Sequence, residues 1–191
     1  MLKITNAYLT PNPYSRPQVK LRKILALVLH WVENPGTSAN FNRSYFERRR
    51  YGKTGYGSAH YIVDLSGDIL ACIPIDEMAY HVGAAKYTTY ALAKFGIYPN
   101  DCTLGIELCH LDWAGRFTTE TLDAAGELCA DLCEELDLEP EEAITTHNAI
   151  TGKICPKYFI DNPDDLDAFR SGVKQRLLRT LAQGEDGGSS A

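Results

Sequence analysis

An uninterrupted apolar run, ILALVLHW at residues 24–31, constrains the fold of this chain more than any other segment. The run has the length of a strand, and it lacks the alternation of apolar and polar residues that marks a strand with one exposed face. We therefore predict a central strand that is buried on both faces of a sheet. Such a strand needs a layer of structure on each side, so the chain is expected to combine a sheet with helices.

Four further segments are predicted to complete the sheet. SAHYIVD and DILACIPI, at residues 58–64 and 68–75, flank the turn sequence LSGD and are predicted to form a hairpin. CTLGIELCH, at residues 102–110, is predicted to be another strand. A short strand is expected within AITTH, at residues 143–147.

Capping residues and apolar spacing predict three helices. The first is expected to begin after Thr37 or Ser38, and the second after Thr118 or Thr119, because these side chains suit the N-cap position. The third is expected to open at Pro163, since proline suits the first turn. The order of elements predicts an α/β fold, with a mixed central β-sheet flanked by α-helices on both faces.

The length of 191 residues favours one domain. Residues 1–182 are expected to form it, with residues 1–20, which contain three prolines, as an extended N-terminal arm. Residues 183–191, QGEDGGSSA, are small and polar, and we expect a flexible, linker-like C-terminal tail there.

Charge and hydropathy exclude some partners. The net charge of -6 argues against nucleic acid, because phosphate binding needs a basic surface, and the basic run at residues 48–53 is interpreted as a solvated helix end. No apolar stretch of about 18 residues is present, so membrane insertion is not expected. The first residues lack a signal peptide, which predicts synthesis in the cytoplasm, with action elsewhere only after release. A monomer is expected.

The six cysteines do not resemble a disulfide framework. Four lie in apolar strand-like or helix-like segments and are predicted to be reduced, buried thiols: Cys72, Cys109, Cys129 and Cys133. Cys155 stands apart in a polar loop before Pro156.

The loop that contains Cys155 is the first candidate for chemistry. ITTHNAITGKICPKY, at residues 144–158, also contains His147, and His30 ends the apolar run described above. Zinc binds imidazole nitrogen and thiolate sulfur, and a catalytic zinc site uses three protein ligands. His30, His147 and Cys155 are therefore candidates for one zinc site. The residues alone leave open that each is an ordinary buried or structural side chain.

Five sequence segments follow one another along the chain: LVLHW, SAHYIVDLSGDILACIP, AYHVG, TLGIELCH and THNAITGKICP. Their order and spacing resemble the zinc-dependent N-acetylmuramoyl-L-alanine amidases of the second type, over about residues 22–160. That family includes phage and bacterial wall lysins and is similar in fold to the peptidoglycan recognition proteins. Five segments in register are far more specific than any one of them.

The resemblance implies roles for individual residues. It implies that His30, His147 and Cys155 bind one zinc ion per chain. It implies that Glu107 is the acid/base group and that Lys153 faces the substrate carbonyl. Without the resemblance, Glu107 would be interpreted as the solvent face of a strand and Lys153 as a solvated loop residue.

Two further histidines match family positions that line the groove or support the site. His60 and His81 are on this basis expected to bind substrate. Some relatives have a tyrosine just before the position of His60, whereas this chain has Ala59, so more of the catalytic role is expected to fall on Glu107. Cys109 and His110 are interpreted as packing and rim residues.

The function that the resemblance implies is zinc-dependent hydrolysis of the amide bond between N-acetylmuramic acid and L-alanine in peptidoglycan. A phage or prophage endolysin is expected, and a host autolysin or muropeptide-recycling amidase is the alternative within this class. Two other classes remain open. One is a non-catalytic peptidoglycan-binding module, whose members typically lack the cysteine. The other is a cysteine hydrolase with Cys155 as nucleophile and His147 as base, which leaves His30 and Glu107 without roles.

Overall fold

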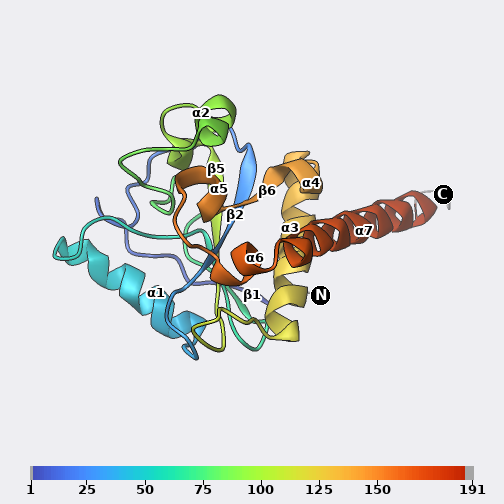
Figure 1. Cartoon of the computed structure of the whole chain (residues 1–191), viewed down its shortest axis with the longest axis horizontal. Coiled ribbons are helices and arrows are strands. Elements are labelled where there is room, and N and C mark those ends of the chain that lie inside the picture. The colour runs from blue at the N-terminus through green and yellow to red at the C-terminus, as the bar shows by residue number, and fades with distance from the viewer. Residues whose placement is uncertain (1, 188–191) are drawn as a thin grey trace.

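A mixed sheet of six strands forms the centre of residues 2–187, the part of the chain that the computed structural model describes (Figure 1). The strands are β1 (Ile4–Asn6), β2 (Ala26–Trp31), β3 (Tyr61–Val63), β4 (Ile69–Ala71), β5 (Thr103–Leu108) and β6 (Ile144–Thr146). They lie in the order β1-β4-β3-β5-β2-β6. All six residues of β2 are buried, which confirms the predicted central strand.

The directions of the strands bring three strand ends together. β2 runs parallel to β5 and to β6, and β3 runs parallel to β5, whereas β4 is antiparallel to β3. The carboxyl ends of β2, β5 and β6 therefore meet at one edge of the sheet, where ligands bind in open α/β sheets. In this register His30 of β2 pairs with Glu107 of β5.

Helices cover both faces of the sheet, as predicted (Figure 1). They are α1 (Ala39–Arg48), α2 (Thr89–Phe95), α3 (Thr119–Leu136), α4 (Pro140–Ala143), α5 (His147–Thr151), α6 (Lys157–Asp161) and α7 (Pro163–Gly187), with 3-10 turns at Arg49–Tyr51 and Pro99–Asp101. Ser38 and Thr118 cap α1 and α3 through their side chains. Within residues 2–187, none of these helices has both the length and the apolar character needed to cross a membrane.

The apolar core has a large layer on one face and two smaller ones on the other. On the first face, α3 and α7 cover a cluster that includes Leu29, Ile106 and Leu128. On the second face, α1 packs near Ile62, while α2 and α5 pack near Val28. Burying each such aliphatic side chain contributes roughly 2 kcal/mol. The second face is divided between two helix groups, and the strand ends carrying His30 and Glu107 lie between them.

The N-terminal arm, predicted to be extended over residues 1–20, instead forms the edge strand β1 and then a turn at residues 13–15 that the bridge between Asn12 and Arg16 closes. β1 pairs with β4, and the backbone N–H groups of Ala7 and Leu9 donate to Ala71 and Cys72. Further along, the Arg16 guanidinium donates two hydrogen bonds of 2.8 Å to the carboxylate of Glu77. Both side chains are largely buried, at 13% and 9% exposure.

Replacing Arg16 with methionine is expected to lower the free energy of unfolding by about 3 kcal/mol, because it leaves the Glu77 carboxylate buried without its partner. Urea denaturation would measure the loss. Lys3→Met is the matched control, since the pair of Lys3 with Asp68 is exposed at 76% and 50% and an exposed pair contributes little to stability. Equal losses in the two variants would contradict this interpretation.

Two parts of the fold differ from the sequence prediction. α2 and the short helices α4, α5 and α6 were not expected, since four to seven residues do not show a helical period. The tail expected at residues 183–191 is helical over its first five residues, because α7 continues to Gly187. A helix that is already formed gains one hydrogen bond for each added residue. Residues 188–191 of the expected tail lie outside the described residues.

Candidate active site

Two of the candidate ligands come from the ends of neighbouring parallel strands. His30 is the fifth of the six residues of β2, and its side chain is buried. His147 follows β6 directly and is the first residue of α5, whose N-cap is Thr146. The shared carboxyl edge of the sheet therefore brings the two imidazoles together, with their ring centres 4.7 Å apart.

Hydrogen bonds from Asn148 hold the loop that supplies the third candidate ligand. Gly152 ends α5 with a φ of +80°, which suits glycine, and the chain then turns back. The backbone N–H of Asn148 donates to the carbonyl of Cys155 (2.9 Å), and its side-chain amide donates to the carbonyl of Lys153 (2.8 Å). These bonds return both Lys153 and Cys155 to the edge of the sheet.

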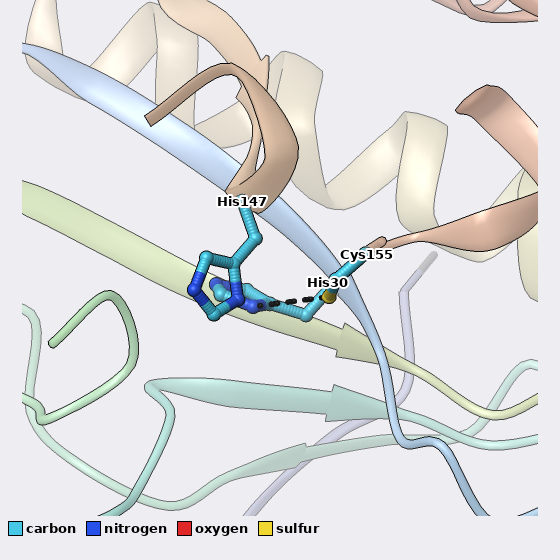
Figure 2. A group of neighbouring side chains, drawn as sticks. All are labelled: His30, His147 and Cys155. Atoms are coloured by element: carbon cyan, nitrogen blue, oxygen red, sulfur yellow. Dashed lines mark hydrogen bonds between the residues drawn. The ribbon is translucent and has the colours of Figure 1, made fainter. Parts of the chain in front are cut away.

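The three side chains converge from β2, from the start of α5 and from the loop that follows it (Figure 2). Their ligand atoms all lie within 4.8 Å of one another. His30 Nδ1 is 3.6 Å from the sulfur of Cys155. The structure thus brings together His30, His147 and Cys155, separated by up to 125 residues of sequence.

The protonation states of the two histidines leave them able to bind a cation. Burial lowers the pKa of His30 well below its usual range and that of His147 to about 4, so both imidazoles are neutral and keep a lone pair. Burial raises the pKa of the Cys155 thiol, and a bound metal ion would oppose this by favouring the thiolate. Two neutral imidazoles and one thiol are a donor set that zinc accepts, so the residues fit the implied metal.

Glu107 is not on a solvated face of its strand. Its Oε2 atom is buried and has no hydrogen-bond partner among residues 2–187. Burial raises the pKa of Glu107 to about 8, although the positive charge of Lys153 works against this rise. A carboxyl group with a pKa near neutrality can both take up and release a proton, as an acid/base group must.

Lys153 lies at the rim of the site and contacts Glu33. Its Nζ atom is 2.9 Å from Oε2 of Glu33, and both side chains are about half exposed. Burial lowers the pKa of Lys153, but the hydrogen bond that Lys153 donates to Glu33 and the nearby acidic groups together outweigh burial and raise the pKa, so Lys153 is charged. Glu33 was not predicted as a site residue. It lies in the turn VENPG just after the His30 strand and has a φ of +52°.

Two hollows meet at Lys153 and Arg49, which line both of them. The first, of about 420 Å³, is lined by Trp31, Asn34, Tyr45 and Glu107 among others. The second, of about 670 Å³, is lined largely by aromatic side chains: Tyr56, Tyr80, Tyr87 and Tyr98. Both hollows therefore border Lys153 at the rim of the site.

Arg49 was interpreted as part of a solvated helix end, and the structure corrects this. Its guanidinium donates to the carbonyls of Thr54 (2.6 Å) and Tyr56 (3.1 Å) and to the hydroxyl of Tyr45 (2.6 Å). Arg49 thus holds the loop that follows α1 in place between the two hollows. The carbonyls that it binds lie in a glycine-containing turn, and no sequence pattern marked them as its partners.

The substrate-binding role predicted for His60 does not agree with the structure. His60 is fully buried, its Nδ1 accepts a hydrogen bond from the Gly105 N–H, and its Nε2 lies 2.9 Å from the carbonyl of Glu77. Both ring nitrogens are therefore used in joining β5 to the loop after β4.

The substrate-binding role predicted for His81 also does not agree with the structure, whereas a supporting role, which the resemblance also allowed, does. His81 lines the aromatic hollow but is only 7% exposed, and its ring nitrogens face His30 and Thr103. Neither nitrogen is left for a substrate, so the ring supports the site from behind.

The remaining predicted packing residues are confirmed. Cys72, Cys109, Cys129 and Cys133 are free, buried thiols. His110 is buried beside Trp31, with ring centres 4.6 Å apart, and its ring nitrogens contact Asn34 and Asp112.

The fold and the cluster define an α/β protein with a candidate metal centre at the carboxyl edge of its sheet. The family model described as N-acetylmuramoyl-L-alanine amidase matches residues 20–158. The chain is 31% identical over 183 residues to the N-acetylmuramoyl-L-alanine amidase BlyA of Bacillus subtilis, covering 93% of this chain and 48% of that protein. It is 35% identical over 179 residues to a probable N-acetylmuramoyl-L-alanine amidase of Bacillus licheniformis, and the match covers 94% of this chain and 49% of that protein.

The chain belongs to the N-acetylmuramoyl-L-alanine amidase family. It spans about half the length of the curated relatives that it matches. Solved structures share the fold. The catalytic domain of PlyG has a TM-score of 0.72 at 20% identity, covering 92% of this chain and 96% of that one. A mutant endolysin from Bacillus subtilis has a TM-score of 0.69 at 21% identity, and the match covers 91% of this chain and 99% of that one.

Proposed function

We propose that this protein hydrolyses the amide bond between N-acetylmuramic acid and L-alanine in peptidoglycan, with one zinc ion held by His30, His147 and Cys155. The observation that carries the proposal is the buried His–His–Cys cluster, in a chain of the amidase family, beside a carboxyl group of raised pKa. An amide resists attack by water, so such a site must supply a nucleophile and stabilise negative charge. Zinc, when bound, lowers the pKa of water to about 7 and polarises a carbonyl group.

In this proposal Glu107 moves the protons. Its Oε2 atom has no partner among the described residues, and the raised pKa allows it to take a proton from the attacking water. The same group then returns a proton to the departing alanine nitrogen, which would otherwise leave as an unstable anion. Acid/base catalysis of this kind contributes about 10²–10⁴-fold.

Lys153 supplies positive charge at the rim. Because its ammonium group is charged and half exposed, it can turn from Glu33 toward the oxygen of the substrate carbonyl as negative charge develops there. An exposed pair such as Lys153 with Glu33 is worth less than about 1 kcal/mol, so a substrate can displace it.

The two hollows suit a substrate that continues on both sides of the cleaved bond. Peptidoglycan has this form, with a glycan strand on one side of the amide and a peptide stem on the other. The proposed place of action is the cell wall, reached after synthesis in the cytoplasm, as in an endolysin.

A thiol nucleophile is less consistent with the site. A reactive cysteine has a lowered pKa and a partly exposed sulfur, whereas burial raises the pKa of Cys155 and the residue is only 2% exposed. A binding module without activity would have no need for a buried carboxyl group beside its ligands.

Metal analysis together with digestion of purified peptidoglycan tests the proposal. We expect about one zinc ion per chain and the release of peptides with a new L-alanine amino terminus. A chelator should stop the release, and added zinc should restore it. Release that survives metal removal but is blocked by a thiol alkylator would replace this mechanism with that of a cysteine hydrolase.

A further inference from the structure

We infer that His81 is a positioning residue that fixes the tautomer of His30, so that His30 presents the unprotonated Nδ1 to the metal. This inference rests on the proposed zinc site. It depends on a chain of hydrogen bonds that runs behind the site from Pro99 through Thr103 and His81 to His30.

The Thr103 end of this series of hydrogen bonds determines which atoms donate and which accept. The Thr103 hydroxyl donates to the carbonyl of Pro99 (2.7 Å), so its oxygen is left to accept. His81 Nε2 lies 3.1 Å from that hydroxyl oxygen and 3.2 Å from the Thr103 carbonyl, which can only accept. The proton of His81 is therefore on Nε2.

The other nitrogen of His81 then acts on His30. The hydrogen bonds described for the His81 ring nitrogens are to His30 and Thr103 only, so no carboxylate there balances a charge and the ring is neutral. Its Nδ1 is consequently an acceptor, 3.0 Å from His30 Nε2, and His30 must donate from Nε2. A neutral His30 then carries no proton on Nδ1, the atom 3.6 Å from the Cys155 sulfur.

The His81 ring is held firmly enough to perform this role. Its backbone N–H donates to the side-chain oxygen of Asn100 (3.1 Å). Behind the ring lies Gly105, where a Cβ atom would be 2.5 Å from Cγ of His81. Only glycine leaves the space that the ring occupies, so the ring lies directly against the backbone of β5.

Partners that orient a metal-binding histidine typically account for about 10–100-fold in metal affinity. His81 is expected to have an effect of this size without touching the metal or the substrate. The resemblance indicated only that His81 lines the groove or supports the site, and the hydrogen bond to His30, 51 residues away, is seen only in the structure.

Two variants of similar size test the inference. Asparagine can place its side-chain oxygen near the position of the histidine Nδ1 atom and accept the same bond, whereas leucine has a similar shape and no acceptor. Zinc affinity, measured by competition with a chelator, is expected to fall about 10–100-fold in His81→Leu and to be largely recovered in His81→Asn. Equal losses in the two variants, or wild-type affinity in His81→Leu, would overturn the inference.

Nitrogen-15 NMR of the metal-free wild-type protein gives an independent readout that needs no variant. His30 is expected to be protonated at Nε2, and protonation at Nδ1 would contradict the inference even if His81→Leu failed to fold. Neither readout depends on turnover. A protein that binds zinc with this His81 dependence but does not cleave peptidoglycan would disprove the proposed function alone.

Discussion

Cys155→Ala is expected to abolish zinc binding under conditions that saturate the wild-type protein, and to abolish turnover with it. The variant removes one of the three proposed protein ligands. Since loss of an orienting partner alone costs about 10–100-fold in affinity, loss of a ligand should cost more than about 100-fold. Metal content after gel filtration and the release of L-alanine-ended peptides would measure the two effects.

Cys129→Ala is the matched control for this prediction. Cys129 is also a buried, free thiol, but it lies in α3 on the opposite face of the sheet. Its variant should keep both zinc and turnover. Cys155→Asp separates the metal from a thiol nucleophile, because a carboxylate can bind zinc but cannot act as a thiolate. Partial zinc binding and activity in Cys155→Asp are expected, and a fully active, zinc-free Cys155→Ala protein would refute the ligand assignment.

Glu107→Gln is expected to keep zinc and fold but to lower turnover by about 10²–10⁴-fold, because glutamine has the shape of glutamate and cannot transfer a proton. Single-turnover rates on purified peptidoglycan would measure the loss. Glu134→Gln, on the exposed side of α3, should leave the rate unchanged. Near-normal turnover in Glu107→Gln would remove this residue from the mechanism.

The same variant should be more stable than the wild type when both are free of metal. The pKa of Glu107 is about 8 in the folded chain and near 4.5 when unfolded, so the folded state holds the extra proton between these values. Wild-type stability therefore falls as the pH rises from 4.5 to 8, and glutamine removes this loss. The advantage of Glu107→Gln should grow over this window and level off above pH 8, at roughly 5 kcal/mol, since one pKa unit is about 1.4 kcal/mol. Urea denaturation at pH 5 and pH 8.5 would measure it.

The main strands and the candidate ligands were predictable from the sequence because each is marked by residues that lie close together along the chain. The run at residues 24–31 has no polar interruption, and β2 is buried along its whole length. Ser38 and Thr118 are caps because their side chains bond backbone groups three residues away. The positions of His30, His147 and Cys155 followed from short segments that also match the family.

The supporting contacts were not predictable, because they join side chains that are distant in sequence. Lys153 contacts Glu33 across 120 residues. The ring nitrogens of His60 and His81 are used in bonds within the protein, and this could be seen only once β5 was placed beside them. His60 and His81, two polar residues in family motifs, were therefore predicted to contact substrate, whereas in the structure they hydrogen-bond to other parts of the protein.

The register of β2 against β5 also bears on how the chain becomes active during folding. His30 and Glu107 share a face only because these strands pair in one alignment, and a slip of one residue would turn Glu107 toward α3. Closing the 125-residue separation between His30 and Cys155 is costly in chain entropy until the sheet between them exists. A partly folded chain thus has neither a complete ligand set nor an aligned carboxyl group. The proposed hydrolytic activity therefore requires the native topology, so the folding reaction itself would delay its onset.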